Sequence, residues 1–189
     1  MNNYQNVGKG LNRMFIATLG MMACALFAVF PLVGIVFAIG VEAFYVMDLS
    51  GYYLAGKDIK ACKIAFIIRI ISVILSTVSI FVKMPNDIEF VYATVETVLP
   101  LVAMGLVFVS VSKALCESGA ENLAKEGIII LWMYVILNVV LILLNLYTSA
   151  AGEVLWITLI SLVLSLVALL MQLRFLYAGA EHFKVRRVD

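Results

Sequence analysis

Four ionisable residues interrupt long apolar stretches of the sequence, namely Glu42, Asp48, Arg69 and Glu96. An ionisable side chain inside a membrane-spanning segment costs roughly 2.5–3.5 kcal/mol on insertion scales. Such residues are kept where they bind an ion, move a proton or neutralise one another. These four are therefore the first candidates for a functional site.

Glu42 and Glu96 form the first candidate group, together with Asn138. On the helices expected at 31–55 and 88–114, the two acids lie about 16 Å and about 12 Å from the same surface. Two nearby carboxyl groups in a low-dielectric interior share protons readily, because two adjacent negative charges are unfavourable. This arrangement is typical of a proton-coupled or cation-binding site. The alternative is that each neutral glutamic acid donates a hydrogen bond to a neighbouring helix.

Asp48 and Arg69 form the second candidate group. They lie about 12 Å and about 10 Å from the opposite surface, on consecutive expected helices. We expect an ion pair between them. The pair could be structural, neutralising two costly charges, or it could belong to a functional site. Alternatively, Arg69 could extend its side chain to the lipid headgroups.

Other catalytic or metal-binding chemistry has little support. Three cysteines, Cys24, Cys62 and Cys116, are widely spaced, and His182 is the only histidine. A structural zinc site needs four clustered ligands. The sequence also has no phosphate-binding loop and no nucleophile–base motif. We expect no metal, no cofactor, no catalytic residues and no enzyme activity.

The composition indicates which elements must position these residues. The chain has 189 residues, of which 65% are hydrophobic and 13% charged, and its mean hydropathy is +1.11. Soluble domains are about 45–50% apolar and about 25% charged. We therefore expect an all-α integral membrane protein with one transmembrane domain over residues 1–189 and the lipid bilayer around it. The net charge of +1 gives no basis for a nucleic-acid partner.

Six transmembrane helices are predicted. Four apolar segments are evident, at 64–82, 88–114, 127–147 and 154–177. Residues 14–55 would make one helix about 63 Å long, twice the hydrocarbon thickness of about 30 Å. Because proline starts a helix well but interrupts its interior, Phe30-Pro31 is the expected break, giving helices 11–30 and 31–55.

The charges predict how the bundle is oriented. With six spans, twelve of the thirteen Lys and Arg residues fall on the side of the two termini, and only Lys83 falls on the other. Basic residues concentrate in cytoplasmic loops. We therefore expect a multi-pass protein of the plasma membrane with both termini in the cytoplasm. Tyr52 and Tyr53 are expected at the inner headgroup level, where amphipathic rings settle.

A possible internal repeat divides the bundle into three helical hairpins. Gly56, Gly119 and Gly179 each follow a small residue and precede an acid by two positions, and they are 63 and 60 residues apart. Such a period suggests a repeated unit, with each glycine ending a helix in a left-handed cap. Helix ends at one membrane surface could also converge on this chemistry without duplication. The candidate hairpins are 11–56, 62–119 and 127–179.

Two classes of function fit these observations. The first is a small permease, or the membrane-embedded substrate-binding subunit of a transporter, which needs a polar site for a small-molecule solute. The second is a non-transporting partner of another membrane protein: a scaffold, an assembly factor or a toxin-immunity protein. Convergence of Glu42, Glu96 and Asn138 on one cavity would favour the first class. Separate positions facing different interfaces would favour the second.

The charge distribution makes the topology testable with reporter fusions along the chain. External location is expected after Phe30, Met84 and Ala151, and cytoplasmic location after Lys60, Glu121 and Asp189. A reporter that reads as cytoplasmic after Phe30 would contradict the six-span topology.

Overall fold

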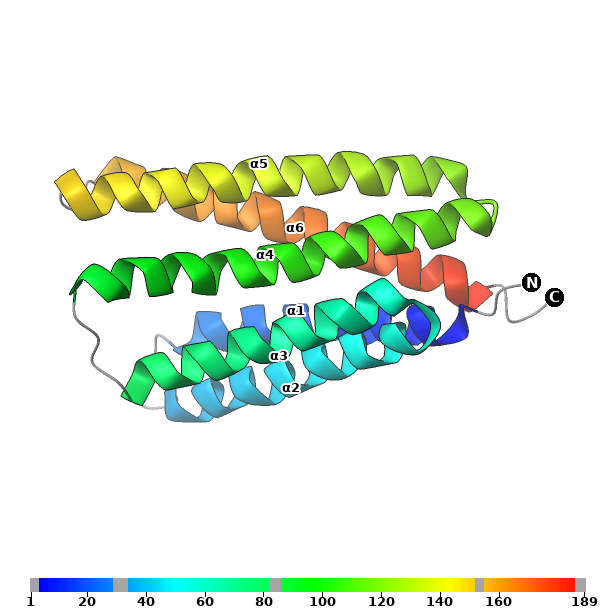
Figure 1. The fold of residues 1–189 in the computed structure, drawn as a ribbon, viewed down its shortest axis with the longest axis horizontal. Helices are drawn as coiled ribbons and strands as arrows, with labels where there is room; N and C mark the ends of the chain where they lie inside the picture. Colours follow the sequence, from blue (N-terminus) through cyan, green and yellow to red (C-terminus); the bar gives the residue numbers. More distant parts are fainter. Residues whose placement is uncertain (1–3, 29–33, 82–85, 152–154, 186–189) are drawn as a thin grey trace.

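The computed structural model describes residues 4–28, 34–81, 86–151 and 155–185, and this part of the chain is all-helical (Figure 1). Its helices are α1 Gln5–Ala28, α2 Gly34–Asp58, α3 Lys60–Phe81, α4 Asn86–Glu117, α5 Glu121–Ala151 and α6 Leu155–Val185. The prediction of an all-α chain with six helices is confirmed. Four stretches are long and apolar enough to cross a membrane: Gln5–Phe27, Thr97–Glu117, Glu121–Leu144 and Leu155–Lys184.

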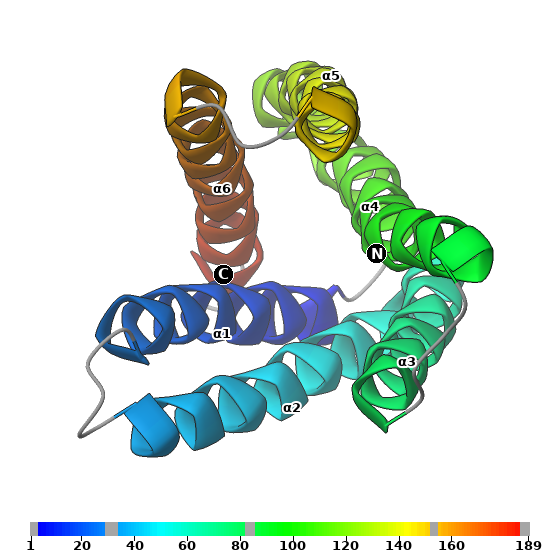
Figure 2. The same cartoon turned by 90° about the vertical axis from the view of Figure 1, so that its left-hand side faces the viewer.

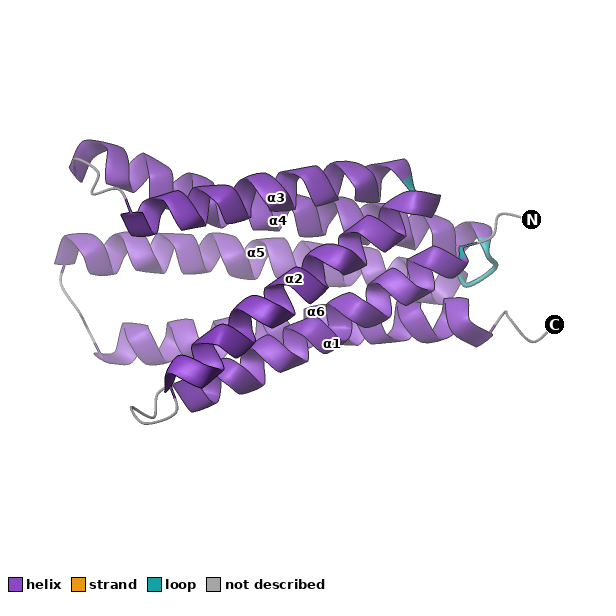
Figure 3. Ribbon diagram, turned by 90° about the horizontal axis from the view of Figure 1, so that it is seen from below, coloured by secondary structure: helices purple, strands orange, loops and turns teal. Residues whose placement is uncertain are grey.

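The six helices form a ring of antiparallel neighbours. Each helix packs against the next one in the chain, and α1 also packs against α6, which closes the ring when the bundle is seen end-on (Figure 2). The start of α1 and the end of α6 lie at the same end of the bundle (Figure 1), which is called the terminus-bearing end below. The helices converge at this end and diverge towards the other (Figures 1 and 3).

The region 14–55 contains two helices rather than one, since α1 ends at Ala28 and α2 begins at Gly34. The proposed break at Phe30-Pro31 lies in the segment 29–33, outside the described residues. The helices also continue past the apolar runs at the terminus-bearing end, where α1 starts at Gln5 and α6 reaches Val185.

Only one of the three repeated glycines ends a helix. Gly119 has φ 83°. The Gly119 N–H donates to the carbonyl of Cys116 at 3.0 Å, and the Ala120 N–H donates to that of Leu115 at 2.9 Å. These two bonds make a Schellman motif that closes α4.

The prediction that Gly56 and Gly179 are helix caps is wrong, because both lie inside helices. Their small size instead permits close packing. A Cβ on Gly56 would lie 3.0 Å from the Cα of Lys63, and one on Gly179 would lie 2.9 Å from Cδ1 of Leu11. The repeat of three hairpins stays a prediction.

The buried core lies in the half of the bundle that carries the termini. The largest fully buried side chains come from α1, α2, α4 and α6: Tyr52, Phe108, Phe175, Leu11, Met14, Leu115 and Leu176. Phe108 stacks on Phe175 with 4.1 Å between ring centroids and on Tyr134 with 6.0 Å. This aromatic stack joins α4, α5 and α6 where they converge.

Polar contacts join the helix ends around this core. The Asp58 carboxylate, at the end of α2, accepts the backbone N–H groups of Asn6 and Val7 at 2.8 and 3.2 Å. It therefore satisfies donors that the first turn of α1 leaves open. Between α4 and α6, the Ser118 hydroxyl and His182 Nε2 are hydrogen-bonded at 2.8 Å.

The helices α1 and α2 approach closely where two glycines face each other. A Cβ on Gly10 would lie 2.6 Å from the carbonyl oxygen of Gly51 and 2.8 Å from the backbone nitrogen of Ala55. Real Cβ atoms almost never approach backbone so closely. Small residues at such a crossing let two backbones approach and gain dispersion contacts.

Gly10→Ala should therefore destabilise the bundle by about 1–3 kcal/mol, the usual effect of overpacking. Gly105→Ala is the matched control, because its added Cβ would meet its nearest atom, Cδ1 of Leu131, at 3.9 Å. The control should be neutral or stabilising by up to about 1 kcal/mol, because alanine favours helix. The measurement is unfolding of the purified protein in detergent. Equal effects of the two substitutions would contradict the close crossing.

Candidate functional site

The structure brings Asp48 and Arg69 together between α2 and α3. Arg69 Nη2 lies 3.3 Å from Asp48 Oδ2, and Arg69 Nε donates to the same oxygen at 3.4 Å. The side chain of Asp48 is only 4% exposed, and that of Arg69 is 13% exposed. A charged pair thus lies inside the bundle.

Helical periodicity positions the pair. On α2, residues 45, 48, 52 and 55 are spaced by 3, 4 and 3 positions, and on α3 residues 62, 65, 69 and 72 have the same spacing. Residues with this spacing lie on one face of a helix. Both rows contain fully buried members, such as Ala55 and Cys62. The two inward faces therefore meet, which sets Asp48 opposite Arg69.

A tyrosine packs against the pair. The guanidinium Cζ of Arg69 lies 4.9 Å from the ring centroid of Tyr45, a cation–π contact. Tyr52 is 1% exposed and lies one turn beyond Asp48 on the same face of α2. Tyr134, from α5, lies within electrostatic range of both charges. The pair is therefore in contact with the ring of Tyr45 and lies in a mostly apolar core.

The sequence interpretation treated Tyr52 and Tyr53 alike and expected both at the headgroup level, a depth that stays a prediction. It did not predict that one of the two is buried inside the bundle. Adjacent residues on a helix point about 100° apart: Tyr52 is fully buried, whereas Tyr53 is 53% exposed. The spacing of four residues from Asp48 to Tyr52 was the available signal, because residues i and i+4 share a face.

The helix α4 packs against α3 near the pair's end of the bundle. The thiol of Cys62 and the hydroxyl of Ser110 lie 3.3 Å apart, which joins α3 to α4. Phe108, two residues before Ser110 on α4, stacks on the ring of Tyr134. Within the described residues, no group of three His, Cys, Asp or Glu side chains lies close enough to hold a metal ion.

The structure does not bring Glu42 and Asn138 together. Glu42 is exposed on α2. Asn138 is half-buried on α5, where its Nδ2 donates to the carbonyl of Tyr134 in its own helix at 2.8 Å. The helices α2 and α5 lie on different sides of the ring (Figure 2).

Glu96 belongs to α4, but its side chain is outside the described part of the structure. Pro100 lies one turn further inside the same helix. Because proline has no N–H, it cannot donate the usual helical hydrogen bond to the carbonyl of Glu96. The proximity of the Glu96 and Glu42 carboxyl groups therefore stays a prediction.

The chemistry available at the pair is recognition of charge. A guanidinium has five N–H donors, and the two bonds described for Arg69 both end on one oxygen of Asp48. Arginine binds carboxylate and phosphate groups in a two-pronged geometry. The groups that such a pair can recognise are therefore a carboxylate or phosphate, by the guanidinium, and a cation, by the carboxylate.

Comparison of the chain with protein-family models, with curated proteins and with solved structures gives no match. The arguments about function therefore rest on the geometry of this chain.

Removing one member of the pair should be costly. Arg69→Ala should destabilise the bundle by about 3–5 kcal/mol, because the buried Asp48 loses its counter-charge. Adding Asp48→Asn should restore part of the loss. The measurement is a double-mutant cycle of unfolding free energies in detergent or lipid.

The control cycle uses the exposed pair Lys184–Glu181, whose Nζ and Oε1 atoms are 3.4 Å apart. Its coupling should be below about 1 kcal/mol, as for other surface pairs. Strict additivity of the Asp48 and Arg69 losses would show that the two residues do not interact.

Proposed function

We propose that all six helices cross the plasma membrane and that both termini lie in the cytoplasm. Four helices have sufficient length and apolarity for this. The other two, α2 and α3, contain 25 and 22 residues, and about 20 residues suffice for one crossing. The concentration of Lys and Arg at the terminus-bearing end supports the orientation.

We propose further that the chain is a small permease or the membrane-embedded substrate-binding subunit of a transporter. The Asp48–Arg69 centre is its solute site. The observation that carries this proposal is a buried charged pair, 3.3 Å apart, with the ring of Tyr45 against the guanidinium. Ligand sites between the helices of a bundle combine apolar and aromatic walls with a few convergent polar groups.

The charges of the centre favour a zwitterionic solute, such as an amino acid. Arg69 would bind the solute's anionic group and Asp48 its cationic group. The interior then keeps a balanced set of charges throughout, so that neither Asp48 nor Arg69 is left buried without a partner. An unpaired buried charge is strongly destabilising, so a solute with a single charge fits this centre less well.

A second candidate function is supported by a different residue. Glu42 is exposed on α2, between Ile39 and Val46, which are 66% and 67% exposed. A carboxyl facing lipid is unfavourable, and a donor on the helix of another membrane protein would offset that cost. This arrangement suits a scaffold, an assembly factor or an immunity protein.

The test of the solute site is a thermal-shift assay of the purified protein in detergent with each of the common amino acids. At least one should raise the melting temperature of the wild type, since a ligand at 100 times its Kd stabilises by about 2.7 kcal/mol. The same compound should have no effect on the double variant Asp48→Asn/Arg69→Gln, which removes both charges and keeps polar side chains at the two positions. Proteoliposomes that contain the wild-type protein should take up the same compound if the protein is a permease, or bind it without uptake if the protein is a substrate-binding subunit.

Glu42→Gln is the matched control, because it changes one carboxyl at a different face of α2. It should leave the thermal shift intact. The solute-site proposal is contradicted if no amino acid gives a thermal shift that depends on Asp48 and Arg69. The partner function replaces it if photo-crosslinkers at positions 39 and 46 also capture one membrane protein, and if Glu42→Gln abolishes that capture.

A further inference from the structure

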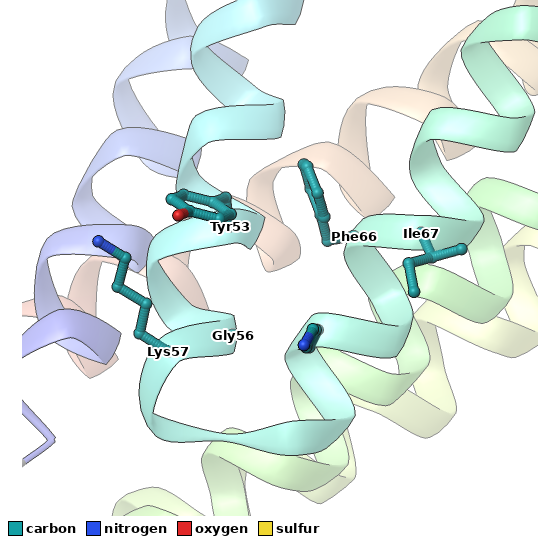
Figure 4. Close-up of a pocket in the computed structure, with 6 residues that line it drawn as sticks. Tyr53, Gly56, Lys57, Phe66 and Ile67 are labelled. Atoms are coloured by element: carbon teal, nitrogen blue, oxygen red, sulfur yellow. The ribbon is translucent and has the colours of Figure 1, made fainter.

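A crevice of about 380 Å³ lies between the end of α2 and the start of α3, at the terminus-bearing end of the bundle. Its lining consists of Tyr53, Gly56, Lys57, Lys63, Phe66 and Ile67. Figure 4 shows Tyr53 and Phe66 projecting from the two helices across the crevice. Their ring centroids are 5.7 Å apart, and Lys57 Nζ lies 5.0 Å from the centroid of Tyr53.

The crevice is positively charged. Lys57 and Lys63 both line it and are exposed. The ion pairs found in the described residues involve other side chains. The nearest acid in the sequence, Asp58, accepts hydrogen bonds from the first turn of α1. The two ammonium groups are therefore available to an external anion.

An apolar track leads away from the crevice along α3. Ile64, Ile67, Ile71 and Ile74 are 53%, 51%, 45% and 56% exposed. Their spacing of 3, 4 and 3 residues places them in one row on the helix surface. Ile67 belongs both to this row and to the wall of the crevice. A ligand with an anionic head and a long hydrocarbon tail matches this combination, whereas a free phosphate would use only the lysines.

We propose that the crevice binds an anionic phospholipid. Lys57 and Lys63 hold the phosphate, Tyr53 and Phe66 pack against the glycerol region, and an acyl chain runs along the isoleucine row. Basic pockets between transmembrane helices on the cytoplasmic side recognise anionic headgroups in this way, and aromatic rings favour the same interfacial depth. The proposal rests on α3 crossing the membrane, and it does not depend on the Asp48–Arg69 centre binding a solute.

The test measures the binding of phosphatidylglycerol to the full-length protein in detergent, by thermal shift and by native mass spectrometry. Phosphatidylglycerol should stabilise the wild type, whereas phosphatidylcholine should not. The variant Lys57→Gln/Lys63→Gln should bind phosphatidylglycerol roughly 30-fold more weakly, from the loss of two lysines at the membrane surface. The matched control is Lys9→Gln/Lys184→Gln, which removes two lysines lining a different crevice at the same end; it should bind normally.

Two further arms separate a lipid from a free anion. Inorganic phosphate at the same concentration should not shift the melting temperature. Ile67→Gln should weaken the binding of phosphatidylglycerol while leaving the protein folded. The proposal is overturned if phosphate alone reproduces the shift, if phosphatidylcholine binds equally well, or if both lysine variants lose the lipid to the same extent. None of these results would bear on amino-acid binding at Asp48 and Arg69.

Discussion

The structure depends on one electrostatic constraint: a charge buried among apolar helices needs a counter-charge within reach. Asp48 and Arg69 meet this constraint for each other, with 3.3 Å between Arg69 Nη2 and Asp48 Oδ2. The contact is possible because the faces of α2 and α3 that carry the two residues point inward. Tyr52 and Cys62 lie on these faces and belong to the buried core. Tyr53, the next residue on α2, lies on the surface, where it borders the lysine-lined crevice.

The sequence was sufficient for the features that depend on hydrophobicity and local chain geometry. The helix count followed from the length of the apolar runs, and the Gly119 cap followed from the conformational freedom of glycine. Gly56 and Gly179 have a similar local sequence, but helix–helix packing decides their role. Glu42 shows the same limit: its place on an expected helix could be read from the sequence, but the side of the helix on which it lies could not, and it is exposed. Six residues of helix rotate Glu42 by about 120° from Asp48.

The packing of the bundle differs between its two ends. At the terminus-bearing end, Phe108, Phe175 and Tyr134 stack in the core between α4, α5 and α6. At the same end, the Asp58 carboxylate of α2 accepts a hydrogen bond from the first turn of α1. Towards the opposite end the helices diverge (Figure 3). The buried charged pair therefore belongs to a bundle whose described core is concentrated at the end where the helices converge. The same end carries the basic crevice between α2 and α3, so the proposed lipid site lies beside the packed region.

The most direct test of the central interaction is a solid-state NMR measurement of the protein in lipid bilayers. Labelling arginine side chains with ¹⁵N and aspartate carboxyl groups with ¹³C would report the dipolar coupling between them. The pair predicts a short-range coupling that disappears in Arg69→Gln and in Asp48→Asn, and that persists in Arg13→Gln. A spectrum in which neither substitution at the pair changes the coupling would contradict the buried Asp48–Arg69 contact and the account built on it.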